Sequence, residues 1–87
     1  MPVAGRFPAT RRGSPGYVQA DVDEFVARIE ATLAGTAAPG QAVAAGDIRA
    51  TQFRVTRRGG YDQVEVDAGL DLLAEELTRQ ARRAGAS

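Results

Sequence analysis

Apolar residues recur at intervals of three and four in two stretches of the chain, and this spacing predicts two amphipathic helices. The first predicted helix runs from about residue 18 to residue 34, and its apolar face contains Val22, Val26, Ile29 and Leu33. The second runs from about residue 62 to residue 84, and its apolar face contains Val66, Leu70, Leu73 and Leu77. Spacings of four, three and four residues are also typical of a short coiled-coil seam. We therefore expect the two helices to pack side by side, in a coiled-coil-like way, through these positions.

Residues at the ends of both predicted helices indicate where each helix starts and stops. Gly35 follows the first apolar stripe and is well placed to end that helix. Asp62 is a favourable N-cap residue, and Glu65 three residues later completes a pattern that resembles a capping box. The first helix has Val18 at the equivalent position, so we expect that helix to start less sharply.

The segment between the two helices divides into a linker and a third, short helix. Residues 35–42 contain Gly and Pro and are typical of a flexible linker. Val43, Ile48 and Phe53 can share one face of a short helix, although Gly46 lowers the stability of that helix by up to about 1 kcal/mol relative to Ala. The prediction is an all-α fold with two long helices and one short helix, in a single domain that spans residues 1–87.

The two long helices belong to an internal repeat, with a first copy at residues 7–34 and a second copy at residues 43–84. The copies align once Ser14 and Pro15 are taken as an insertion in the first. The matched positions are Phe7 with Phe53, Thr10 to Gly13 with Thr56 to Gly59, Gly16 and Tyr17 with Gly60 and Tyr61, and Asp23 with Asp67. A duplicated unit usually needs its partner copy to bury its apolar face.

The aligned positions of the two copies predict asymmetric packing between them. Phe25 aligns with Gly69, so we expect the large ring of the first copy to fill the space that the second copy leaves empty. Leu72 lies off the apolar stripe, and we expect it to cover the short helix or a second chain.

The formal net charge is zero, but the charges are separated along the chain. All 11 basic residues are arginine, the predicted turns are basic, and the helices that follow them are acidic. Two arginine pairs stand at equivalent turns and are candidate contacts for an anionic membrane or a partner protein: Arg11, Arg12, Arg57 and Arg58. The alternative is that these arginines pair with Asp23, Asp67 or nearby helix acids, or only solvate the turns.

The composition argues against catalysis. Cys, His and Lys are absent, which removes thiol nucleophiles and the usual transition-metal ligands together, so we expect no enzyme activity, no metal and no cofactor. We interpret the other matched or motif residues as structural: Gly16, Tyr17, Asp23, Gly60, Tyr61, Asp62 and Asp67. No apolar run approaches the length of a membrane span, and we expect the chain to lie in the cytoplasm.

The stretch RRGGYDQVEVDAGLDLL resembles the DivIVA domain, a bacterial family whose hallmark is a Gly-Tyr-Asp turn followed by a helix with a leucine seam. The residues that carry the resemblance are Gly60-Tyr61-Asp62, Val66-Asp67 and Leu70-Asp71. The preceding GDIRATQF resembles the short first helix of that family. The first copy matches from Phe7 to about Leu33, without the short helix. The resemblance implies a parallel dimer with two equivalent turns at one end, and because this chain contains two such turns, we expect one chain to fold as a pseudo-dimer with its long helices roughly parallel.

The resemblance implies a non-enzymatic scaffold or adaptor of bacterial cell division or polar growth, peripheral at the inner face of the membrane at a septum or pole. Its partners would be proteins of that machinery and an anionic membrane surface, and copies of the chain could associate. Two alternatives stay open. One is a protein interaction module with no membrane contact. The other is nucleic-acid binding through the Arg-Arg-Gly turns and the tyrosines, which the zero net charge and the acidic helices disfavour.

Overall fold

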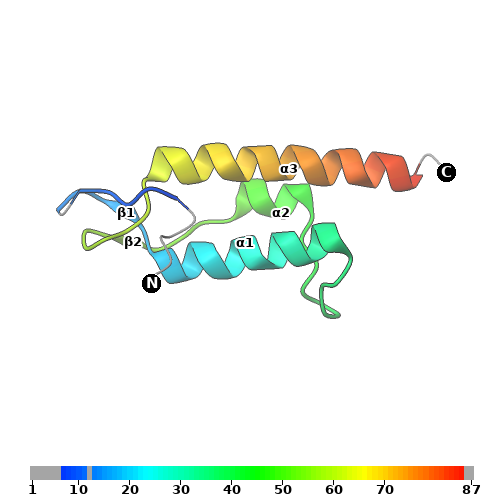
Figure 1. The fold of residues 1–87 in the computed structure, drawn as a ribbon, viewed down its shortest axis with the longest axis horizontal. Helices are drawn as coiled ribbons and strands as arrows, with labels where there is room; N and C mark the ends of the chain where they lie inside the picture. The colour runs from blue at the N-terminus through cyan, green and yellow to red at the C-terminus, as the bar shows by residue number, and fades with distance from the viewer. Residues whose placement is uncertain (1–6, 12, 86–87) are drawn as a thin grey trace.

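The computed structural model describes residues 7–11 and 13–85, and it is mostly helical (Figure 1). Its elements follow in the order β1 (Gly16–Tyr17), α1 (Gln19–Ala34), α2 (Ala45–Ala50), β2 (Val55–Thr56) and α3 (Gln63–Gly85). The predicted helical class, with two long helices and one short helix, is confirmed. The sequence did not predict β1 and β2, which add a small antiparallel sheet to this mainly helical fold.

Helices α1 and α3 start at the same end of the molecule and run in the same direction (Figure 1). Their apolar faces form the core, together with residues of the connecting segment. The buried members of the two predicted faces are Val22, Val26, Ile29, Val66, Leu70 and Leu77, while Leu33 and Leu73 are partly buried against them. The two helices therefore share one core, and α2 packs against α3.

The ends of α1 follow the sequence prediction. Val18 is the N-cap residue and provides no side-chain hydrogen bond, as expected for an apolar residue at that position. Gly35 ends the helix in the left-handed conformation, with a φ of 76°, which a residue without a side chain adopts at little cost. The amide of Gly35 donates to the Thr32 carbonyl at 3.2 Å, and that of Thr36 donates to the Ala31 carbonyl at 2.8 Å.

The predicted capping box at the start of α3 is only half formed. The amide of Glu65 donates to Asp62 Oδ1 at 3.1 Å, so Asp62 caps the helix as expected. The amide of Asp62 donates to the Pro8 carbonyl at 2.8 Å. The Asp62 N–H that Glu65 was expected to bind is therefore already bonded to the first copy.

Helix α2 is shorter than the segment 43–53 suggested. Val43 precedes it and Phe53 follows it, although Val43 and Ile48 are both buried. Thr51 has an extended conformation, and the chain then runs back to the turn end, where the ring of Phe53 packs 5.3 Å from that of Tyr17. The helix ends before Phe53 because the Phe53 ring packs in the aromatic cluster of the turns and not on the face of α2.

The two glycine turns meet at the start of the long helices. Gly16 pairs with Thr56 and Tyr17 with Val55 in the sheet. Tyr17 and Tyr61 also exchange backbone hydrogen bonds, from the Tyr17 amide to the Tyr61 carbonyl at 3.0 Å and from the Tyr61 amide to the Tyr17 carbonyl at 2.8 Å. The predicted arrangement, with both turns at one end, is thus present in the structure.

Gly16 and Gly60 allow this meeting because neither has a side chain. A Cβ on Gly60 would lie 2.7 Å from the Gly16 carbonyl carbon and 2.8 Å from the Tyr17 carbonyl oxygen. A Cβ on Gly16 would lie 2.7 Å from the Tyr61 carbonyl oxygen. Any side chain at either position would push the two backbones apart.

The expected match between Phe25 and Gly69 was wrong. The space beside Gly69 holds the ring of Phe7, whose Cε1 lies 2.6 Å from where a Gly69 Cβ would stand. Phe25 packs edge-on against Phe53, with ring centroids 5.8 Å apart. Because Phe7 and Phe53 are equivalent in the repeat, the turn of each copy places its ring on the helix of the other. Leu72 is 66% exposed, so it does not cover α2.

We expect Gly60→Ala to destabilise the fold by about 1 to 3 kcal/mol, because its Cβ would overlap backbone atoms that cannot move independently. Gly46→Ala is the matched control, since no atom lies within 4 Å of its added Cβ. It should stabilise the protein by up to about 1 kcal/mol through helix propensity. Urea unfolding monitored by circular dichroism measures both, and equal effects would contradict the assigned close approach.

Candidate functional site

The two tyrosines of the turns each bind the aspartate of the other copy. The hydroxyl of Tyr61 donates to Asp23 Oδ1 at 2.6 Å, and that of Tyr17 donates to Asp67 Oδ1 at 3.1 Å. Tyr61 is fully buried, whereas Tyr17 is half-buried. Burial, and secondarily the bond to Asp67 and its negative charge, raise the pKa of Tyr17 above its ordinary value. The residues interpreted as a structural motif are therefore brought together across the repeat.

The aromatic rings of the turns also pack across the two copies. Phe7 packs edge-on against Tyr61 with centroids 5.5 Å apart, and Phe53 packs against Tyr17 with centroids 5.3 Å apart. Offset and edge-on aromatic pairs contribute about 0.5 to 1.5 kcal/mol beyond the area that they bury. This cluster packs residues of each copy against the other at the turn end.

Backbone hydrogen bonds also join the copies in equivalent pairs. The amide of Val18 donates to the Arg54 carbonyl at 2.9 Å, and the amide of Asp62 donates to the Pro8 carbonyl at 2.8 Å. These bonds are equivalent because Val18 aligns with Asp62 and Arg54 aligns with Pro8. Each helix start is thereby tied to the segment that leads into the other copy's turn.

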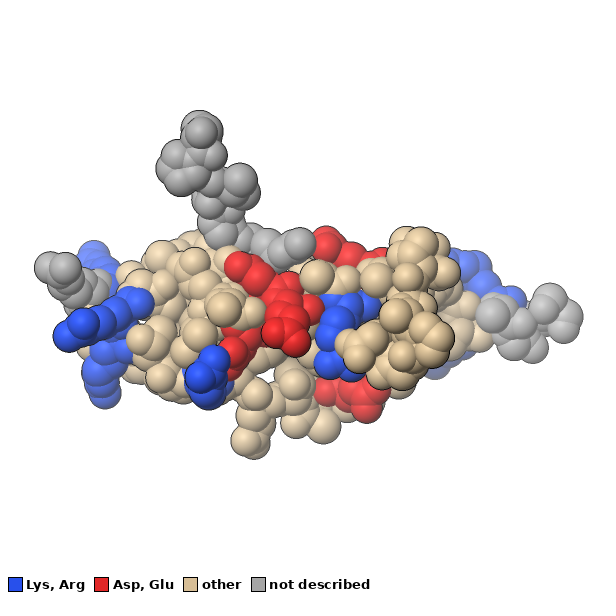
Figure 2. Space-filling view, turned by 90° about the horizontal axis from the view of Figure 1, so that it is seen from below, with Lys and Arg blue, Asp and Glu red and all other residues tan. Residues whose placement is uncertain are grey.

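Three of the four candidate contact arginines lie in the described part of the chain. Arg11, Arg57 and Arg58 are exposed, and Arg12 lies outside the described residues. Figure 2 shows basic side chains gathered at the turn end and acidic side chains in a band behind them. Arg57 Nη1 donates to the Gly13 carbonyl at 2.9 Å, which links the two turn tips.

The alternative of ion pairing applies to none of these three arginines. Within residues 7–11 and 13–85, the ion pairs involve Arg54, Arg79 and Arg83 instead. Asp67, one of the carboxylates expected to neutralise the turns, accepts the Tyr17 hydroxyl. The positive charge of Arg11, Arg57 and Arg58 therefore faces solvent.

An open hollow of about 790 Å³ lies between the two turn tips. Its described lining consists of Thr10, Gly13, Arg57, Arg58 and Gly59. Gly13 and Gly59 have φ angles of 90° and 71°, so both tips adopt a left-handed conformation that favours glycine. The guanidinium groups of Arg57 and Arg58 are the groups of this lining that can attract an anion.

An ion pair that sequence reasoning missed joins Arg54, the residue before β2, to Asp21 of α1. Arg54 Nε and Nη2 donate to the two carboxylate oxygens of Asp21 at 2.9 and 2.7 Å, and the Arg54 amide donates to Asp21 at 3.3 Å. The hydrogen bonds from Arg54 lower the pKa of Asp21, and Asp21 in turn raises the pKa of Arg54. The first copy has a proline at the position equivalent to Arg54. This difference between the copies was the signal in the sequence that Arg54 makes a contact that its equivalent does not.

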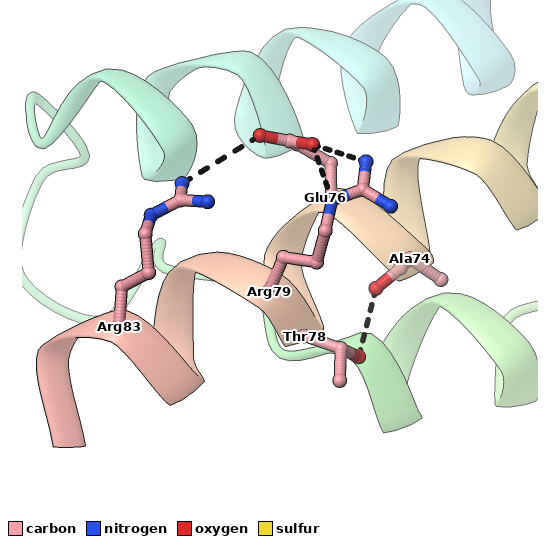
Figure 3. Close-up of polar contacts among 5 residues, drawn as sticks. All are labelled: Ala74, Glu76, Thr78, Arg79 and Arg83. Atoms are coloured by element: carbon pink, nitrogen blue, oxygen red, sulfur yellow. Dashed lines mark hydrogen bonds and ion pairs between the residues drawn. The ribbon is translucent and has the colours of Figure 1, made fainter. Parts of the chain in front are cut away.

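The opposite end of α3 holds a second group of charges. Glu76 accepts hydrogen bonds from Arg79 and lies 3.8 Å from Arg83 (Figure 3). Arg79 lowers the pKa of Glu76 through these bonds and its charge. Thr78 lies beside them, and its hydroxyl donates to the Ala74 carbonyl at 3.0 Å within the helix.

In residues 7–11 and 13–85, no group of three or more acidic side chains is placed to hold a metal ion. No described helix has both the length and the apolar character needed to cross a membrane. No family model, curated protein or solved structure matches the chain. The site must therefore be interpreted from its own geometry.

We expect Tyr61→Phe to destabilise the protein by about 1.5 to 3 kcal/mol, because it removes a buried hydrogen bond to a carboxylate. Tyr17→Phe removes the equivalent bond at a half-exposed position, where water can replace the hydroxyl, so its cost should stay below about 1 kcal/mol. Urea unfolding of both variants measures the difference. A larger loss for Tyr17→Phe would contradict the assigned burial.

Arg54→Met should raise the pKa of Asp21 toward its ordinary value. A carboxylate whose folded-state pKa is lowered stabilises the fold above its unfolded-state pKa, and this contribution is lost as the pH falls through the folded-state value. The variant should therefore lose less stability than the parent between about pH 7 and about pH 3. NMR titration of the Asp21 carboxyl carbon and unfolding at both pH values test this, with Arg57→Met as the control.

Proposed function

We propose that the chain is a non-enzymatic scaffold or adaptor module whose turn end contacts an anionic surface, as its resemblance to DivIVA domains leads us to expect. The observation that carries this proposal is the exposure of Arg11, Arg57 and Arg58 at one end, without ion-pair partners in the described part of the chain. The aromatic cluster beneath them holds both turn tips in place, so the charges are arranged before any ligand binds.

Electrostatics supports an anionic membrane as the surface. A basic residue close to an anionic leaflet contributes about 1 kcal/mol, so three arginines contribute roughly 3 kcal/mol. That attraction is weak for a single chain and falls with salt, since screening is strong beyond about 8 Å at physiological ionic strength. A planar guanidinium also matches the geometry of a phosphate group. Several chains held together would bind far more firmly than one.

In this proposal the two turn and helix units are DivIVA-like repeats, and α1 and α3 form a short coiled-coil-like pair. The shared starting end of the helices and the burial of Val22, Val26, Val66 and Leu70 between them support it. The chain would then lie at the inner face of the membrane, at a septum or pole, with proteins of cell division or polar growth as its partners.

A protein interaction module without membrane contact is the second candidate. The hollow between the turn tips favours it, because its volume falls in the range of ligand sites and it could admit acidic side chains of a partner. Nucleic-acid binding has less support, since the acidic band behind the arginines in Figure 2 would repel a polyanion that extended past the tips.

The test is co-sedimentation with vesicles of anionic or neutral lipid at low salt. Replacing Arg11, Arg57 and Arg58 together by Ser should reduce binding to anionic vesicles about 100-fold, the factor that corresponds to roughly 3 kcal/mol. The matched control replaces Arg49, Arg82 and Arg83 by Ser, which removes equal charge at exposed positions away from the turns and should leave binding largely intact. Equal losses in the two variants would contradict a contact through the turns.

A further inference from the structure

The exposed face of α3 carries an apolar residue between two opposite charges. Glu65, Leu72 and Arg79 follow one another at intervals of seven residues, so they lie on one face of the helix. All three are exposed, and Leu72 is exposed to 66%. Ala68, on the same face, is exposed as well. The face therefore has the order acidic, small, apolar and basic along the helix.

Helix α1 has no such face, which shows that the feature does not come from the repeat itself. Arg28 aligns with Leu72, and its guanidinium lies over the Phe25 ring at 5.9 Å while its Nε donates to the Gln41 carbonyl at 3.4 Å. On α1 the side chain at this position thus makes contacts within the chain, whereas on α3 the side chain at this position faces solvent. Val64, also on α3, is a second large apolar side chain that faces solvent, exposed to 74%.

The charges of α3 are divided between its two halves. The half next to the turns carries acidic residues without a base, namely Glu65, Asp67 and Asp71. The far half ends in Arg79, Arg82 and Arg83, of which Arg79 is bound to Glu76 and Arg83 lies at the outer limit of contact with it (Figure 3). Two acids, Glu75 and Glu76, stand against these three arginines, so the far half keeps a net positive charge.

The geometry points to an antiparallel contact between the α3 helices of two copies of this chain, centred on Leu72. In this register, the numbers of two residues that face each other sum to twice 72. Leu72 therefore packs against Leu72 of the second copy on the two-fold axis. Glu65 then faces Arg79 of the second copy, and the same pair forms again on the other side of the axis. Ala68 faces Glu76, which leaves room for close approach of the helices.

The charges decide the orientation. A parallel pair would place Glu65 beside Glu65 and Arg79 beside Arg79, and would align the helix dipoles unfavourably. The antiparallel pair places each Glu65 beside an Arg79 and sets the helix dipoles in opposite directions, so both interactions become favourable. One helix face buries less than the roughly 800 Å² per partner of a typical stable interface, so we expect a Kd of about 10 μM to 1 mM. The inference does not depend on the function proposed above.

The orientation is tested with a single spin label at Val64→Cys, because the chain has no cysteine of its own. Every measured distance then joins two copies. The antiparallel register separates the labelled backbone positions by about 24 Å along the helix axis, whereas a parallel pair would leave them about 10 Å apart. Distances near the shorter value, or no dipolar coupling at about 1 mM protein, would overturn the proposal.

Sedimentation equilibrium tests the residues. Leu72→Asp should abolish association, because it places two carboxylates together on the axis, while Val55→Asp, an exposed apolar position near the turns, should leave the Kd unchanged. Glu65→Arg should weaken association at least about tenfold, and combining it with Arg79→Glu should restore it to within about threefold of the parent. Failure of that restoration, in variants whose circular dichroism matches the parent, would exclude the facing pair.

Discussion

The close approach of Gly16 and Gly60 is the constraint on which the rest of the structure depends. Two backbones can exchange hydrogen bonds between Tyr17 and Tyr61 only because neither glycine carries a Cβ. This contact places the start of α1 beside the start of α3 and directs the tyrosine of each copy at the aspartate of the other. The same contact brings the two turn tips together, where the amide of Gly13 donates to the Arg57 carbonyl at 3.0 Å.

The helices could be predicted from the sequence because their signals are local. The apolar spacing, Gly35 and Asp62 each act within one or two helical turns, and α1 and α3 begin and end within about a residue of the prediction. The shared orientation of the helices was predicted from the repeat together with the resemblance to DivIVA domains. These features need no knowledge of which residues meet across the chain.

The contacts that were missed are all long-range. Strands of two residues are too short for any alternation of apolar and polar positions, so β1 and β2 left no pattern to detect. Phe7 reaches Gly69 and Arg54 reaches Asp21 through the exchange between copies, which no spacing within one copy encodes. The candidate arginines could be identified from the sequence. Whether acidic residues neutralise them could not, because that depends on which side chains meet across the two copies.

The exchange between copies has a consequence for how the chain assembles. The Tyr17 hydroxyl finds its acceptor 50 residues away and the Tyr61 hydroxyl finds its acceptor 38 residues away, so neither half can complete its own turn. The halves are joined by the largely exposed segment 35–42. A short flexible tether gives its ends an effective concentration in the millimolar range. Below that protein concentration, each half pairs with the other half of its own chain. Above it, two chains can exchange halves. The linker is therefore the element that keeps the fold within one molecule.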